Sequence, residues 1–487
     1  MNAANTTSSV QREEQKPHEE CGVFGIASSS GTINPAQACY NGILALQHRG
    51  QESCGIAVND DGVLSYVKDM GLVTDVFNQE RLAKLKGQMG VGHVRYAAGE
   101  GNVRENAQPL VMRYVKGAIA LVYNGVLTNA FELRHELESN GSIFQTTTDP
   151  EIISYLIARE RVNAPSIEVA MQRVMDRLEG AYAMVLLSPQ KLIAVRDPYG
   201  LKPLCMGKVD DAVVFSSEST GLDAVGATLE RDVTPGEVVV VKNGEVKSLF
   251  CSIKVPKASC IFEYIYFARD DSIIDGVSVY EARKESGRIL ARQHPVEADM
   301  VIGVPESGND AAIGYSEESG IPYEKGIVKN GYVGRTFIRP TQAERERGVK
   351  IKLNPLTSAV AGKRVIMLDD SIVRGTTSAR IVKMLKEAGA KEVHLRISSP
   401  PFIKPCYYGS DIGSEDELIA AKHTVEEIRQ IVGADSLGFL EVDSLKDIIW
   451  EKTGFCDACF TGNFPSKISE HLVNGDQEEY SRPLHRF

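Results

Sequence analysis

The stretch that most constrains the fold is residues 365–377, which read VIMLDDSIVRGTT. Its apolar first half is typical of a buried strand, and that strand ends in two adjacent carboxylates, Asp369 and Asp370. Gly375 permits a tight turn before a helix, whose N-terminal N–H groups and dipole favour a phosphate. Paired carboxylates suit ribose hydroxyls and Mg²⁺. A polar helix cap is the ordinary alternative for the Asp-Asp pair alone, but the complete stretch favours a site for a sugar phosphate.

Strand–loop–helix alternation surrounds this stretch. We expect strands at 300–304, 364–368 and 392–397, and helices that end near Gly320 and Ala388. Such alternation indicates a parallel sheet, and parallel sheets place their ligands at the carboxyl ends of the strands. The chain after about residue 275 is therefore predicted to be an α/β fold.

Residues 21 to about 250 show a different pattern. Short β-rich runs lie at 63–67, 193–196 and 213–216, and helical patterns cover 36–47 and 129–140. Asn243-Gly244 lies between two apolar runs, which is a strong hairpin signal. This mixture predicts an α+β fold, in which layers of helices cover largely antiparallel sheets. The chain is expected to divide near residue 250.

Length and charge limit the class of protein. The chain has 487 residues, enough for two or three domains, and a formal net charge of −11, which argues against a nucleic-acid partner. No apolar run reaches the roughly 18 residues of a membrane span, so no membrane partner is expected. Residues 1–20 are polar and contain four glutamates, which is atypical of a transit peptide. We expect a cytoplasmic protein, or an organellar one if a transit peptide has been removed.

The nine cysteines point to metal binding or chemistry more than to disulfides, because their number is odd and no secretion signal is present. Cys456 and Cys459 form a Cys-x-x-Cys, a spacing compatible with zinc, with redox chemistry and with no function at all. Together with Cys260 and Cys406 they would give four thiolates, which suit either Zn²⁺ or an iron–sulfur cluster. The wide dispersal of the four favours a link between distant parts of the chain.

The stretch 365–377 resembles the signature with which type I phosphoribosyltransferases bind phosphoribosyl pyrophosphate (PRPP). By this resemblance, the PRPP-binding residues of the stretch are Asp369, Asp370, Ser371, Arg374, Gly375, Thr376 and Thr377. Residues 304–308 (VPESG) resemble the neighbouring pyrophosphate loop, which implies that Ser307 helps the two aspartates bind Mg²⁺. Residues 329–338 resemble the flexible loop that closes over PRPP, and this implies PRPP contacts for Arg335 and Thr336. Gly331 stands where that loop usually has a basic residue.

Residues 20–26 (ECGVFGI) resemble the start of the N-terminal-nucleophile glutaminases. In that family a leader is removed and a cysteine becomes the first residue. The resemblance therefore implies that residues 1–20 are a propeptide and that Cys21 is the nucleophile. A free α-amine has a pKa of about 7.7–8.0 and a thiol one of about 8.5, so the amine is a well-matched base for its own thiol.

Further segments follow the glutaminase pattern in order. Residues 46–53 (LQHRGQES), 196–200 (RDPYG) and 217–219 (SES) match it. The resemblance implies that Arg95 binds the glutamine carboxylate, that Asn124 and Gly125 form the oxyanion hole, and that Asp149 binds the ammonium. Alone, each of these residues is more typical of a surface charge or a turn, but their order and joint presence favour catalysis.

Four positions depart from the glutaminase pattern. Tyr123 stands where the family usually has His, Val126 stands where it usually has Asn, and Ala97 and Ala98 replace a Ser or Thr. We expect the loss of one hydrogen bond to glutamine, which is worth about 1 kcal/mol. The nucleophile, the oxyanion donors and the charged ligands of glutamine remain, so the sequence predicts glutaminase activity that is at most weakened by this loss.

From Cys21 to about residue 465, the chain resembles the glutamine-dependent amidophosphoribosyltransferases of the type that carries a [4Fe–4S] cluster. The resemblance implies that the cluster ligands are Cys260, Cys406, Cys456 and Cys459. Asp270 stands where the family usually has Pro, which removes no ligand. The implied fold is an N-terminal-nucleophile αββα sandwich in residues 21–255. A type I phosphoribosyltransferase parallel-sheet domain follows in residues 256–487 and ends in a cluster-binding segment.

The activity that this resemblance implies is transfer of the glutamine amide nitrogen to PRPP. The products are 5-phosphoribosylamine, glutamate and pyrophosphate, in the first step of de novo purine biosynthesis. The implied cofactors are Mg²⁺ and the cluster, and the implied partners are purine nucleotide inhibitors and other copies of the chain in a homotetramer. Two alternatives stay open: an ammonia-dependent phosphoribosyltransferase with an impaired glutaminase, and a PRPP-binding regulator.

Overall fold

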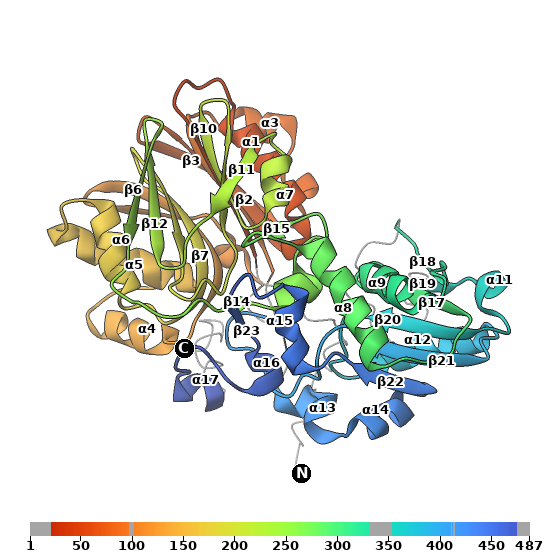
Figure 1. The fold of residues 1–487 in the computed structure, drawn as a ribbon. Helices are drawn as coiled ribbons and strands as arrows, with labels where there is room; N and C mark the ends of the chain where they lie inside the picture. The colour runs from red at the N-terminus through yellow and green to blue at the C-terminus, as the bar shows by residue number, and fades with distance from the viewer. Residues whose placement is uncertain (1–20, 97–101, 332–352, 411, 413, 475–487) are drawn as a thin grey trace, which may run out of the picture.

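Two bodies of secondary structure follow one another along the chain (Figure 1). The computed structural model describes residues 21–96, 102–331, 353–410, 412 and 414–474. The predicted leader 1–20, Ala97, Ala98 and the predicted PRPP ligands Arg335 and Thr336 lie outside the described residues.

The first body contains two antiparallel sheets. One has seven strands in the order β11-β9-β10-β1-β4-β2-β3, and the other has six in the order β13-β12-β8-β7-β6-β5. The strands of the first sheet are β1 (Gly22–Ser28), β2 (Ser53–Asp60), β3 (Val63–Met70), β4 (Met89–Arg95), β9 (Cys205–Val209), β10 (Ala212–Ser216) and β11 (Thr228–Asp232). Those of the second are β5 (Leu110–Tyr114), β6 (Gly117–Leu127), β7 (Gly180–Leu187), β8 (Leu192–Arg196), β12 (Glu237–Lys242) and β13 (Glu245–Phe250).

Side-chain alternation along the strands builds the layers of this body. On β1, Val23 faces the core between the two sheets, whereas Phe24 packs with helix α1 (Pro35–Ala45) on the outer face. On β6, Val122 lies in the core between the sheets, and Tyr123 lies in the core that the second sheet shares with α5 (Asp149–Asn163) and α6 (Ile167–Met175). The layers are thus helix, sheet, sheet and helix, which confirms the predicted αββα sandwich.

Local signals in the sequence explain several element boundaries. Asn243 and Gly244 have positive φ angles of 51° and 79° in the tight turn between β12 and β13, as the Asn-Gly signal predicts. Helix α1 begins after Asn34, whose side chain accepts N–H groups at the first turn. The helix predicted over 129–140 is α4 (Ala130–Ser139).

The second body has a four-stranded parallel sheet, in the order β17-β20-β21-β22, between two pairs of helices. On β20, Leu368 packs with α8 and α9 on one face, and Met367 packs with α12 and α14 on the other. The elements are β17 (Met300–Gly303), β20 (Arg364–Asp369), β21 (Glu392–Ile397), β22 (Ser436–Phe439), α8 (Val279–Gln293), α9 (Asn309–Ser319), α12 (Thr376–Glu387) and α14 (Val425–Val432). The predicted parallel α/β fold is confirmed, and β22 is a strand that the sequence pattern did not reveal.

The last part of the chain returns to the first body (Figure 1). β23 (Phe455–Cys456) pairs in parallel with β14 (Ser259–Cys260), and the His471 ring of α17 (Glu470–Asn474) stacks on Phe131 of α4 at 4.1 Å. The remaining short elements are η1 (Gln47–Arg49), α2 (Val73–Val76), α3 (Gln79–Ala83), η3 (Arg104–Asn106), α7 (Ser219–Asp223), η4 (Glu263–Phe267), β15 (Ile273–Ile274), β16 (Val277–Ser278), β18 (Ile327–Lys329), β19 (Leu353–Pro355), α11 (Thr357–Val360), η5 (Glu415–Glu417), α13 (Ile419–Lys422), η6 (Val442–Ser444), α15 (Leu445–Ile448) and α16 (Ala458–Thr461). Within the described ranges, no helix has the length and apolar character needed to cross a membrane.

Candidate functional site

Cys21 lies immediately before β1 and is only 6% exposed. Because β1 pairs antiparallel with β4 and Gly22 lies opposite Val94, Cys21 falls beside Arg95 at the end of β4. The Cys21 Sγ is 3.9 Å from the carbonyl oxygen of Tyr96. The structure thus brings the predicted nucleophile and the predicted carboxylate ligand to the same end of the first sheet.

The loop 46–53 supports the backbone of Arg95. The Glu52 N–H donates to the Arg95 carbonyl at 3.1 Å. Gly50 lies so close that a Cβ there would be 2.5 Å from the Arg95 carbonyl carbon, which only glycine tolerates. This close approach explains why the loop needs a glycine at that point, and it fixes the direction from which the Arg95 side chain leaves the strand.

Asn124 and Gly125 lie on β6, in the sheet that faces β1 and β4. The side chain of Asn124 is fully buried, and neither its Oδ1 nor its Nδ2 has a hydrogen-bond partner among the described residues. Gly125 has φ 142°, and a Cβ there would be 2.0 Å from the Ala181 carbonyl oxygen. A buried amide without a partner costs about 1–3 kcal/mol, so such groups call for a specific explanation. A bound ligand would supply the missing hydrogen bonds.

His93 connects the two sheets next to these residues. Its Nε2–H donates to the carbonyl oxygen of Tyr123 at 2.9 Å, which joins β4 to β6. Burial lowers the pKa of His93 to about 3, so its imidazole is neutral at physiological pH. This bond sets Arg95 on β4 and Asn124 on β6 across from each other without placing a charge between them.

Asp149 is the first residue of α5 and faces β6. Its Oδ2 accepts the Leu127 N–H at 2.8 Å and the Tyr123 hydroxyl at 3.2 Å. Burial raises the pKa of Asp149 to about 6, although both hydrogen bonds and the nearby Arg134 act in the opposite direction. Asp149 is therefore a half-buried carboxylate that is mainly ionised at pH 7.

A second constellation forms at the carboxyl edge of the parallel sheet. Asp369 ends β20, and Asp370, which follows it, is completely buried. The hydroxyl of Ser307, in the loop after β17, donates to Asp370 Oδ1 at 2.5 Å, and that of Ser371 donates to Oδ2 at 2.6 Å. Gly375 has φ 87° and caps α12, which begins at Thr376. The structure thus brings the two predicted loops together, since they follow neighbouring strands β17 and β20.

Two basic residues of this edge are paired with carboxylates. Arg374 forms an ion pair with Glu417 at 2.6 Å, and Lys329 of β18 forms one with Glu306 at 3.1 Å. These ion pairs are partly exposed, and such pairs are individually weak. A phosphate can therefore compete for both cations.

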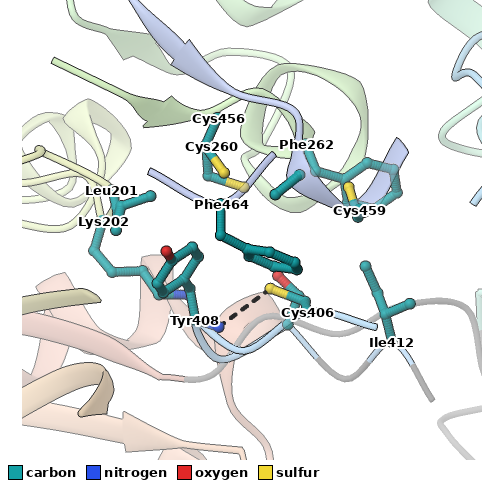
Figure 2. Close-up of a pocket in the computed structure, with 12 residues that line it drawn as sticks. Leu201, Lys202, Cys260, Phe262, Cys406, Tyr408, Ile412, Cys456, Cys459 and Phe464 are labelled. Carbon is teal, nitrogen blue, oxygen red and sulfur yellow. Dashed lines mark hydrogen bonds between the residues drawn. The ribbon is translucent and has the colours of Figure 1, made fainter. Parts of the chain in front are cut away.

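The four cysteines of the predicted cluster line one cavity of about 20 Å³. Cys260 of β14 lies opposite Cys456 of β23, Cys459 follows Cys456 in the same Cys-x-x-Cys, and Cys406 comes from a separate loop. Figure 2 shows the sulfurs of Cys260 and Cys456 together, with the ring of Phe464 between them and Cys406. The structure therefore brings together four residues from the middle and the end of the chain.

The chemistry of this cavity suits a metal group bound by sulfur. Burial raises the pKa of Cys260, Cys456 and Cys459, and the neighbouring thiols raise it further, so without a bound cation these thiols keep their protons. A metal group would have to displace the protons in order to bind. The Tyr408 N–H donates to the Cys406 Sγ at 3.4 Å, and Lys202 also lines the cavity. Within the ranges that the structure describes, however, no three or more histidine, cysteine or acidic side chains stand in metal-ligand geometry. The four cysteines thus supply the donor atoms of a four-thiolate group, although the described side chains are not arranged as in a bound one.

A buried ion cluster joins the two bodies and has no counterpart in the sequence-based analysis. Arg49, fully buried after α1, bonds to Glu218 and also to Glu263 of η4, at 2.7 Å. Glu218 further accepts the Ser272 hydroxyl at 2.6 Å and the Arg269 N–H at 3.0 Å. The signal that could have revealed the cluster is that Arg49 and Glu218 fall inside the matching segments 46–53 and 217–219, and that catalysis alone does not explain these charges.

Comparison with known proteins places these sites in a family. A family model described as a glutamine amidotransferase domain matches residues 93–224. An amidophosphoribosyltransferase of Archaeoglobus fulgidus is 50% identical over 451 residues, which are 92% of this chain and 98% of the relative. That of Bacillus subtilis is 49% identical over 462 residues, 94% of this chain and 96% of the relative. The chain belongs to the amidophosphoribosyltransferase family.

Solved structures of this amidophosphoribosyltransferase fold agree along nearly the whole chain. The PRPP amidotransferase of B. subtilis, complexed with ADP and GMP, has a TM-score of 0.87 and 49% identity, and the match covers 92% of this chain and 98% of that one. A structure described as the allosteric regulatory enzyme of purine biosynthesis has a TM-score of 0.89 and 47% identity, and covers 96% and 100%. The family, the fold class and the enzyme class that the sequence predicts are therefore confirmed. The protein is an enzyme of glutamine-dependent amidotransfer to PRPP in purine biosynthesis.

Proposed function

We propose that the glutamine half of the reaction takes place between the two sheets, in a domain of residues 21–255 from which the leader 1–20 is removed. Cys21 attacks the glutamine amide carbon, and its freed α-amine takes the thiol proton. Asn124 Nδ2 and the Gly125 N–H hold the resulting oxyanion. Ammonia leaves, and water then releases glutamate from the thioester.

The observation that carries this proposal is the state of Asn124. Its buried amide has no hydrogen-bond partner among the described residues, and it lies beside a glycine whose geometry excludes any side chain. Such an amide is costly in a structural core but useful if it binds charge that develops only during the reaction. Arg95 and Asp149 would hold the α-carboxylate and α-ammonium of glutamine at the two sides.

We propose that the PRPP half takes place in residues 256–487, at the carboxyl edge of the parallel sheet. Asp369 and Asp370 bind the ribose hydroxyls, and together with Ser307 they would hold Mg²⁺, which supplies positive charge to the pyrophosphate. Gly375, Thr376 and Thr377 at the start of α12 bind the 5′-phosphate through N–H and hydroxyl groups. Ser371 and Arg374 complete this loop, and Arg335 and Thr336, outside the described residues, would close over the substrate. Ammonia displaces pyrophosphate from C1 and gives 5-phosphoribosylamine.

We further propose that Cys260, Cys406, Cys456 and Cys459 hold a [4Fe–4S] cluster with a structural role. No step above transfers an electron, and the segments that carry the four cysteines connect the middle of the chain to its end. When bound, the cluster would link these segments and replace the four thiol protons.

The regulators and the assembly are also proposals. The B. subtilis relative is described in a complex with ADP and GMP, which supports purine nucleotides as regulators of this enzyme. We expect a homotetramer in the cytoplasm; chloroplast relatives such as that of Arabidopsis thaliana, 48% identical over 467 residues, point to organellar forms within the family.

The test compares two nitrogen donors. Cys21→Ser should abolish phosphoribosylamine formation from glutamine and leave formation from NH₄Cl intact, because an alcohol is far less acidic than a thiol. The matched control is Cys39→Ser, a buried cysteine in α1 that the mechanism does not use. Wild-type activity with NH₄Cl alone would instead favour a phosphoribosyltransferase with an impaired glutaminase. No PRPP turnover with either donor would favour a PRPP-binding regulator.

A further inference from the structure

Tyr123 occupies the position where the family usually has a histidine, and it faces away from the core between the sheets. Because side chains alternate along β6, Val122 lies in that core and Tyr123 lies in the core shared with α5. The Tyr123 side chain is 3% exposed, and its hydroxyl donates to Asp149 Oδ2 at 3.2 Å. Tyr123 thus contacts the first residue of α5. From the sequence alone, the tyrosine at this position is seen only as the loss of a histidine.

Both hydrogen bonds that described residues donate to the Asp149 side chain end on the same oxygen. The Leu127 N–H and the Tyr123 hydroxyl bind Oδ2 from two points of β6, four residues apart. Such a two-point attachment fixes the plane of the carboxylate and leaves Oδ1 for a third donor. The substrate group that seeks an anionic acceptor here is the α-ammonium of glutamine.

We propose that Tyr123 is a positioning residue for glutamine: its hydroxyl, together with the Leu127 N–H, holds Asp149 so that the carboxylate meets the α-ammonium of the substrate. The inference rests on the proposed role of Asp149 in the glutamine site. It reverses the sequence-based expectation for this position, because the tyrosine replaces a polar contact instead of removing one.

The charges around Asp149 explain why this hydrogen bond matters. Burial raises the pKa of Asp149 to about 6, and the Leu127 N–H, the Tyr123 hydroxyl and the Arg134 guanidinium of α4 lower it. On α5 itself, the Glu151 carboxylate is bonded to the N–H groups of Gln145 and Thr146. Since only the ionised form attracts an ammonium, loss of the hydroxyl should weaken glutamine binding most at low pH.

The experiment measures steady-state kinetics of Tyr123→Phe, which removes one oxygen and keeps the ring. The KM for glutamine should rise about tenfold, as expected for a hydrogen bond to a charged group. The kcat with glutamine and all kinetics with NH₄Cl should stay near wild type. The increase in KM on acidification should begin at a higher pH than in the wild type, because the pKa of Asp149 rises when a donor is lost.

Two further variants separate positioning from a general structural effect. Asp149→Asn should raise the KM strongly, and adding Tyr123→Phe to it should raise the KM no further, since the hydroxyl acts through the carboxylate. Tyr182→Phe is the matched control: Tyr182 on β7 is fully buried, and its hydroxyl has no hydrogen-bond partner in the described part of the chain. Its KM for glutamine should equal that of the wild type.

The outcomes distinguish this inference from the proposed function. If Asp149→Asn raises the KM but Tyr123→Phe changes it by less than about twofold, the inference is overturned and the glutamine site stands. Additive effects in the double variant, or an equal loss of activity with NH₄Cl, would also overturn it, because the tyrosine would then act on the fold. If Asp149→Asn leaves the KM unchanged, both the glutamine site and the inference fail.

Discussion

Replacing Arg49 by Met should destabilise the enzyme more than the loss of almost any surface charge. Arg49 has no exposed side-chain area, and its partners Glu218 and Glu263 are at most 2% exposed. Removing one member of a buried ion pair leaves an uncompensated charge and typically costs about 3–5 kcal/mol. We expect a loss of this size in the free energy of unfolding of Arg49→Met.

The contacts of the two glutamates show where that cost arises. Glu218 keeps the Ser272 hydroxyl and the Arg269 N–H as donors after the substitution. Glu263 receives side-chain hydrogen bonds from Arg49 alone, as far as the described residues show. The cost therefore falls mainly on Glu263, and adding Glu263→Gln to Arg49→Met should recover most of the lost stability.

The penalty should depend on pH in a defined direction. Burial already raises the pKa of Glu263 in the folded protein, and loss of the neighbouring guanidinium should raise it further. A carboxyl group whose pKa is higher in the folded state loses stability as pH rises from its unfolded pKa, about 4.3, through the folded value. The free energy of unfolding of Arg49→Met should therefore be closest to that of the wild type at low pH. The difference between the two should be largest near pH 8.

Urea denaturation and scanning calorimetry at pH 6 and pH 8 would measure these differences in stability. The unfolding transition that occurs first should be compared, because a chain with two bodies need not unfold in one step. Arg269→Met is the control, since the exposed pair of Arg269 with Asp271 should contribute less than about 1 kcal/mol. A stability of Arg49→Met within about 1 kcal/mol of the wild type at both pH values would refute the reasoning. So would a double variant no more stable than Arg49→Met.

Further predictions concern the other sites. Asp370→Asn should reduce synthesis from glutamine and from NH₄Cl alike, by about tenfold or more, because it removes a charged acceptor. Basal glutamine hydrolysis, measured without PRPP, should be retained. Unchanged PRPP kinetics would count against the assignment. Anaerobically purified protein should contain about four iron and four sulfide per chain, Cys456→Ser should lose both together with stability, and Cys205→Ser should retain them; stoichiometric zinc without iron would reject the cluster. N-terminal sequencing of active enzyme should give Cys21 as the first residue, and a retained leader would contradict the proposed base.

The sequence predicted the fold well where one local rule decides the structure. Residues 392–397 (EVHLRI) alternate polar residues with Val393, Leu395 and Ile397, a period of two that is typical of a strand, and the structure gives the strand the same bounds. Strand β22 escaped prediction because Ser436–Phe439 is short, half-buried and without a clear period, so its pairing with β21 determines it. A local sequence pattern predicts the elements whose own residues show a clear period. It misses the elements that form only because a neighbouring strand pairs with them.

The candidate sites divide in the same way. Adjacent residues such as Asp369 and Asp370 can be assigned from a motif, because residues that are neighbours in the chain are also neighbours in the site. The bond from Tyr123 to Asp149 joins two elements, β6 and α5, and only the packing of the helix on the sheet shows that the hydroxyl reaches the carboxylate. A substitution read from sequence as a loss can therefore be a replacement once the third dimension is known.

The segment 46–53 shows why a long matching stretch need not be catalytic. Its Gly50 and Glu52 hold the backbone of Arg95 in the proposed glutamine site, and its Arg49 holds Glu263 of η4 in the other body. The guanidinium of Arg283 in α8 donates hydrogen bonds to carbonyl groups of η4 and of the residue after it. Helix α8 packs on α9, and α9 follows the loop that contains Ser307. A few consecutive residues thus contact the elements that support both proposed sites. The segment therefore serves as a structural connection between the two bodies, which explains its length without a catalytic role for each residue.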